Sequence, residues 1–131
     1  MPPLLAAIRN QDISATKTAY IAARLTYEQI ESLAVIFPQL DAAIEARPYV
    51  YHTCESYAEF AGFHVLKRTI YRDQQIKDIY SHAVALNNSV NALCRFLYTT
   101  ADVYTPATFT AGSVAFLFEV PAKKVASEEE T

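Results

Sequence analysis

The sequence predicts an all-α protein: a four-helix bundle with short extended segments at one end. Apolar residues recur at steps of three and four along much of the chain, which is the spacing of one helix face. The 131 residues are 52% hydrophobic and 19% charged, so one domain can bury a sizeable core. We therefore expect a single domain over residues 1–131, with an N-terminal arm (about 1–16) and a mobile acidic tail (about 122–131).

The two ends differ in composition from the centre. Residues 1–16 combine two prolines with the polar run Asn10-Gln11-Asp12, which favours an arm. The last residues include three consecutive glutamates at 128–130, which is typical of a solvated tail. The start lacks the basic lead and long apolar stretch of a signal peptide, and no apolar run is long enough to span a membrane. A cytoplasmic location is the resulting expectation.

The first half predicts a short strand followed by two short helices or one kinked helix. Residues 19–22 have the composition of a short strand. Thr26 and Gln29 form a capping-box pattern, in which the two side chains satisfy backbone groups of a helix start. Pro38 interrupts the helical stripe that follows, so we expect a break near Phe37. That stripe comprises Ile30, Leu33, Phe37, Leu40 and Ile44.

The second half predicts two longer helices and a final extended run. Pro48 ends the preceding helix, and residues 49–51 are a plausible strand. Thr53 can cap a third helix over about 54–70. A fourth helix over about 73–98 has the clearest stripe, and the run 114–120 is expected to be extended. The stripe comprises Ile76, Ile79, Ala83, Leu86, Val90, Leu93 and Leu97.

The residue types that usually carry catalysis or bind metals do not form recognisable motifs here. Two cysteines, Cys54 and Cys94, are too few for a disulfide framework. Two glycines leave no phosphate-binding loop. Glu55 and Glu59 lie one helical turn apart but fit a solvated face. The histidines (His52, His64 and His82) lack zinc-site, di-iron or nucleophile spacing and are expected on the surface or as satisfied core residues. We therefore expect no enzyme activity, no cofactor and no metal.

The densest basic stretch lies where the third helix meets the fourth. It contains Lys67, Arg68, Arg72 and Lys77 with one carboxylate, Asp73. Cations at one end of a bundle can bind phosphates. The alternative is a solvated helix end with local ion pairs. The net charge of −3 argues against an ordinary nucleic-acid-binding module, but not against a protein that binds RNA cooperatively.

One segment resembles a known family. Over Val84–Phe118, an amphipathic helix is followed by a short link, then Tyr104 and Phe109, then an apolar run. This order resembles the C-terminal third of the coat proteins of rod-shaped plant RNA viruses, of the tobacco mosaic virus and hordeivirus types. The chain departs from the family motif at Pro106 and Thr110, where the family has arginine and glutamate.

The resemblance implies a structural capsid protein that assembles helically around single-stranded genomic RNA to form a rod-shaped virion. Its partners would be RNA and further copies of itself, with no membrane and no small-molecule substrate, and it would be found in the virion and the host cytoplasm. Bases would lie against one face of the fourth helix, and arginines would meet the phosphates. The matching RNA-binding positions are Lys67, Arg68, Arg72, Ser81, Val84, Ala85 and Asn88.

Two other interpretations remain open at this point. The first is a self-associating helical scaffold or filament protein without nucleic acid, which the negative net charge and the sixteen tyrosines and phenylalanines favour. The second is a helical bundle that binds a small ligand or acts as a catalyst, which only the polar residues within a helical frame favour.

Overall fold

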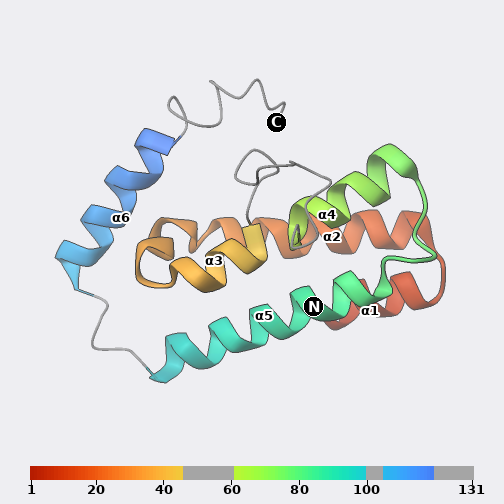
Figure 1. The fold of residues 1–131 in the computed structure, drawn as a ribbon, viewed down its shortest axis with the longest axis horizontal. Helices are drawn as coiled ribbons and strands as arrows, with labels where there is room; N and C mark the ends of the chain where they lie inside the picture. The colour runs from red at the N-terminus through yellow and green to blue at the C-terminus, as the bar shows by residue number, and fades with distance from the viewer. Residues whose placement is uncertain (46–60, 100–104, 120–131) are drawn as a thin grey trace.

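The structure, a computed structural model, describes residues 1–45, 61–99 and 105–119, and every regular element in these ranges is helical (Figure 1). The all-α prediction is confirmed for these parts of the chain. In order, the elements are α1 (Pro2–Arg9), α2 (Ile13–Glu28), the 3₁₀ helix η1 (Glu31–Ile36), α3 (Pro38–Glu45), α4 (Phe63–Lys67), the π-helical η4 (Arg68–Asp73), α5 (Tyr80–Thr99) and α6 (Pro106–Glu119).

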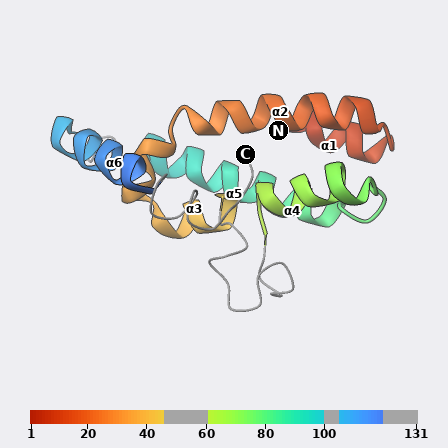
Figure 2. The ribbon, with the colours of Figure 1, turned by 90° about the horizontal axis from the view of Figure 1, so that it is seen from above.

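The helices pack around α5. Helix α1 folds back against α2 and α5, while α3 and α4 follow each other along α5 (Figures 1 and 2). Helix α6 lies at one end of the molecule, where it contacts η1. None of the helices in the described ranges combines the length and the apolar character that crossing a membrane requires.

The N-terminal residues form helices rather than the arm predicted over residues 1–16. Two prolines occupy the first turn of α1, where their missing N–H groups cost nothing. Leu4, Ala7 and Ile8 follow at helical spacing and are buried. The prolines and polar residues of this segment flank a short amphipathic pattern, and the apolar face of α1 packs into the core.

Helix α2 corrects two further predictions. Residues 19–22 are helical, not a strand, and Thr26 lies inside the helix instead of capping its start. The Thr26 hydroxyl donates to the carbonyl of Ala22, four residues earlier, at 2.9 Å. The actual cap is Asp12, whose Oδ1 accepts from the backbone N–H of Ala15 at 2.9 Å.

The break predicted near Phe37 is confirmed. η1 ends at Ile36, and α3 starts at Pro38, in the position where proline is welcome in a helix. The strand predicted over residues 49–51 and the start of the third helix lie outside the described residues. Residues 61 and 62, which were predicted to lie inside that helix, are not helical, and α4 begins at Phe63 and continues into η4.

The fourth helix begins later than predicted. Gln74 has a left-handed backbone (φ +49°) that ends η4, and α5 starts at Tyr80 instead of near Asp73. The predicted core stripe is confirmed, since five of its members are buried and Val90 and Leu97 are partly buried against the core. The five are Ile76, Ile79, Ala83, Leu86 and Leu93.

The C-terminal run predicted to be extended is helical in α6 as far as Glu119. Thr105 begins this helix, because its Oγ1 accepts from the backbone N–H of Thr108 at 3.1 Å, and Pro106 occupies the first position. The predicted extended segments are therefore absent from the described ranges. The predicted acidic tail lies outside them.

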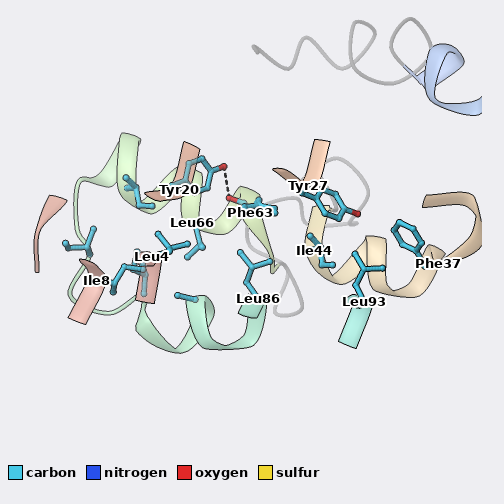
Figure 3. Close-up of a cluster of buried hydrophobic side chains, with 14 residues drawn as sticks. Leu4, Ile8, Tyr20, Tyr27, Phe37, Ile44, Phe63, Leu66, Leu86 and Leu93 are labelled. Carbon is cyan, nitrogen blue, oxygen red and sulfur yellow. Dashed lines mark hydrogen bonds between the residues drawn. The ribbon is translucent and has the colours of Figure 1, made fainter. Parts of the chain in front are cut away.

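Aromatic side chains occupy the centre of the core (Figure 3). The Phe63 ring meets Tyr20 edge-on, with centroids 5.8 Å apart, and Tyr27 at 5.9 Å. The Tyr20 hydroxyl donates to the Phe63 carbonyl at 3.2 Å. These contacts join α2 to α4. Charged residues lie beside this aromatic cluster.

Candidate functional site: a buried charged network

Three ionisable side chains from three helices meet beside this aromatic cluster. Arg24 comes from α2, Glu45 from the last residue of α3 and His64 from the first turn of α4. Their side chains are 16%, 6% and 5% exposed, respectively. Charged side chains are rarely buried to this degree unless they pair with one another.

Glu45 is the centre of the network. Its Oε1 lies 3.1 Å from Nε2 of His64, and its Oε2 accepts from Nη1 of Arg24. The other guanidinium nitrogen of Arg24, Nη2, lies 3.3 Å from Oε1 of Glu28, which is more exposed. The guanidinium carbon also lies 5.7 Å from the centre of the Phe63 ring. Arg24 is thus held on two carboxylates and an aromatic face.

Gly62 brings His64 to Glu45. Its backbone has φ +85°, a conformation that glycine adopts without strain. A Cβ at this position would lie 2.3 Å from the backbone oxygen of Ile44. Because no side chain stands between them, the start of α4 can approach the end of α3 closely. His64, two residues later, therefore reaches the carboxylate at the end of α3.

The electrostatics keep the central pair ionised. Burial alone raises the pKa of Glu45, but hydrogen bonds from His64 and Arg24 outweigh it, so the net pKa lies below the ordinary value. Burial lowers the pKa of Arg24, and the bond to Glu45 more than restores it, so the net shift is upward. The interior therefore holds a carboxylate and a guanidinium whose charges compensate.

Two tyrosines border the network as neutral phenols. Burial raises the pKa of Tyr20. Burial, followed by the hydrogen bond to Oδ1 of Asp41, raises the pKa of Tyr27. Both hydroxyls act as donors, since Tyr20 bonds the Phe63 carbonyl and Tyr27 bonds Asp41. These bonds fix the aromatic walls around Arg24.

A carboxylate oxygen and an imidazole nitrogen are both common metal ligands. Two donors bound to one metal at about 2.1 Å lie about 3 Å apart, as Glu45 and His64 do. Within the described residues, no group of three or more histidine, cysteine, aspartate or glutamate side chains could hold a metal ion. In this part of the chain, the network thus brings together two such side chains, Glu45 and His64, and not a complete set of metal ligands.

The predicted RNA-binding residues lie elsewhere. Arg68 and Arg72, in η4, lie 3.8 Å and 3.2 Å from the carboxylate of Asp73, and Lys67 precedes them in α4. These ion pairs match the alternative interpretation, a helix end with local pairing. Ser81, Ala85 and Asn88 are exposed and Val84 is partly buried, off the core stripe of α5 as predicted. A binding role for these residues stays a prediction.

From the sequence, His64 is expected on the surface or as a satisfied core residue, and nothing there marks Arg24 and Glu45 as candidates. Histidine motifs require partners at short spacing, whereas Glu45 lies 19 residues before His64 and Arg24 lies 21 before Glu45. One usable signal in the sequence was Gly62, which directly precedes Phe63 and His64. A second was the carboxylate of Glu45 at the end of α3.

The helical fold and the buried Arg24–Glu45–His64 network define an all-α protein with an internal charged site. The chain is similar to the iron uptake system component EfeO of Escherichia coli (strain K12), with 32% identity over 124 residues. The match covers 95% of this chain and 32% of that protein, and the EfeO of Shigella flexneri gives the same values. The chain thus spans about a third of the length of these relatives. No protein-family model matches it.

These relatives overturn the resemblance to rod-shaped virus coat proteins. They match 95% of the chain and are bacterial proteins named for iron uptake, whereas the resemblance rested on residues 84–118. The apolar run of that segment, read as a strand, is helical in α6. The predictions of a capsid protein, of helical assembly around single-stranded RNA, and of a virion or host cytoplasm location are therefore wrong. The name of the relatives gives no support to the filament alternative either.

Proposed function

We propose that this chain serves in bacterial iron uptake and that Glu45 and His64 contact the iron. The observation that carries the proposal is the similarity to proteins named as iron uptake components, which extends over nearly the whole chain. The geometry supports it, because Oε1 of Glu45 and Nε2 of His64 are spaced as neighbouring ligands of one metal ion.

Arg24 has a defined part in this proposal. Without iron, its guanidinium balances the charge of Glu45 through Oε2. Iron would approach from the Oε1 side and replace the proton that Nε2 of His64 donates to Glu45, with water or an iron chelator at its remaining positions. The guanidinium keeps the carboxylate ionised and available for a metal. The proposal retains the expectation that the chain is not an enzyme.

The four-helix bundle also remains a proposal. Helices α1, α2 and α5 and the consecutive pair α3–α4 surround one core, which supports it. In this arrangement, the bundle core brings α2, α3 and α4 together where their charged residues meet.

The experiment is anaerobic equilibrium dialysis of the purified chain against a ferrous salt, with magnesium as the control ion. We expect the wild type to retain iron, and Glu45→Gln and His64→Gln to lose at least about tenfold in affinity. Glu28→Gln is the matched control, since Glu28 also pairs with Arg24 but lies outside the proposed ligand pair. A wild-type chain that takes up no iron, or a Glu45→Gln variant that binds normally, would contradict the proposal.

A further inference from the structure

An apolar groove lies between α2 and α5, beside the start of α1, with a volume of about 360 Å³. None of the described residues that line it has a charged side chain. Its wall on α5 comprises Val90, Leu93, Cys94 and Leu97, which share one helix face. Leu93 is buried at the base, while the thiol-bearing Cys94 is exposed at the rim and free. Helix α5 thus presents an apolar face that no described helix covers at this point.

Helix α6 has the complementary property. It has no charged residue before Glu119, and a helix that is apolar around its circumference is normally buried. In the structure, α6 contacts η1, and Gly112 is buried. Three of the large side chains of α6 are mostly in water, since Phe109, Leu117 and Phe118 are 57%, 69% and 68% exposed. The helix therefore leaves several large apolar side chains in water.

We propose that α6 has a second position, in this groove of its own chain, where it lies antiparallel to α5. The two exposed apolar surfaces would then cover each other. Helix α5 ends at Thr99 and α6 begins at Pro106, and helices joined by so short a connection usually pack antiparallel. The groove reaches Leu97, two residues before the end of α5, so α6 can enter from that end.

The lengths agree with this arrangement. The fourteen residues of α6 extend about 21 Å, and the α5 wall from Val90 to Leu97 extends about 10 Å, at ~1.5 Å per residue. Helix α6 can therefore cover the whole groove. If Thr99 faces Pro106 in an antiparallel pair, Cys94 faces the neighbourhood of Thr110.

The first test uses Cys94 as a built-in probe. In a Cys54→Ala background, Thr110→Cys is compared with Ala115→Cys, which lies more than one turn further along α6 and is the matched control. A disulfide requires Cα atoms within about 7 Å, so oxidation by diamide should link Cys94 to the new cysteine at 110 and leave the variant at 115 reduced. The expected product is a monomer that has lost two hydrogens, formed at a rate independent of protein concentration.

The second test does not depend on the register of the two helices. In the same background, the rate at which a maleimide labels Cys94 should rise roughly tenfold in Leu117→Ser, since burying one leucine is worth about that factor in an equilibrium constant. Leu25→Ser is the control, because Leu25 is 55% exposed on α2 and belongs neither to the groove nor to α6. We expect it to label as the wild type does.

The outcomes separate the possible occupants. An intramolecular disulfide at 110 or faster labelling in Leu117→Ser supports the proposal. A disulfide-linked dimer whose yield rises with concentration shows that α6 of a second copy fills the groove, which overturns it. Absence of the disulfide together with unchanged labelling in Leu117→Ser shows that α6 stays away from the groove, which also overturns it.

Discussion

Replacing Glu45 by glutamine should destabilise the protein far more than the same replacement at Glu28. Both carboxylates pair with Arg24, but the side chain of Glu45 is 6% exposed and that of Glu28 is 43% exposed. Glu45→Gln leaves the guanidinium of Arg24 in the interior without its main counter-charge and removes the negative charge that His64 contacts. The pair of variants therefore isolates the effect of burial on one arginine.

The magnitude follows from the burial of the two pairs. Breaking a buried ion pair by removing one partner costs about 3–5 kcal/mol, and the partial exposure of Arg24 places the expected loss near the lower end, about 3 kcal/mol. An exposed pair contributes about 0–1 kcal/mol, so Glu28→Gln should cost no more than that. With a urea dependence of about 1–3 kcal/mol per molar, Glu45→Gln should lower the unfolding midpoint by roughly 1–3 M.

Urea unfolding followed by circular dichroism at neutral pH measures both variants. Adding Arg24→Met to Glu45→Gln removes the stranded charge and should recover part of the loss. Equal urea midpoints for Glu45→Gln and Glu28→Gln would refute the reasoning. They would mean that water screens the Arg24–Glu45 pair as fully as it screens the Arg24–Glu28 pair.

Three further predictions concern the same region. The folded-state pKa of Glu45 lies below its ordinary value, so the ionised carboxylate stabilises the fold above the ordinary carboxyl pKa. This stabilisation is lost as the pH falls through the lowered pKa. Urea midpoints of the wild type and Glu45→Gln, measured at a series of pH values, should therefore converge in acid. Gly62→Ala should cost about 1–3 kcal/mol from backbone strain alone, with a further loss from the clash with Ile44, and thermal unfolding should show it; a midpoint like the wild type's would argue against the close approach. Tyr20→Phe should cost about 1 kcal/mol in urea unfolding, because the Phe63 carbonyl loses its donor while the ring contacts remain, and no loss would indicate that water replaces the hydroxyl.

Helical periodicity predicted the fold class and about half of the buried hydrophobic cluster, while several local signals were misleading. The stripe on α5 identified buried residues correctly because the 3.6-residue repeat is a property of the helix itself. Thr26 and Gln29 form a plausible cap in isolation, but the helix begins at Asp12 and continues past Thr26. The apolar run in α6 fits a strand or a helix, and short apolar runs cannot be assigned by periodicity alone.

The candidate site was harder to predict than the fold because it depends on contacts distant in sequence. Arg24, Glu45 and His64 come from three helices, and each alone resembles an ordinary surface or core residue. What brings Glu45 and His64 together is a backbone approach at Gly62. The coat-protein resemblance failed for a related reason, since it relied on the order of residues in one segment and not on a set of residues that must meet in space.

Phe63 makes three kinds of contact at the boundary between the core and the charged network. Its carbonyl accepts the Tyr20 hydroxyl, its ring packs against both tyrosines of α2, and Arg24 lies over the same ring. A leucine would keep the volume but lose the π face beneath the cation and the quadrupole that orients the tyrosine edges. Changes at this position would therefore loosen the hydrophobic interior and the charged cluster together, so a single substitution would affect both stability and whatever the cluster binds.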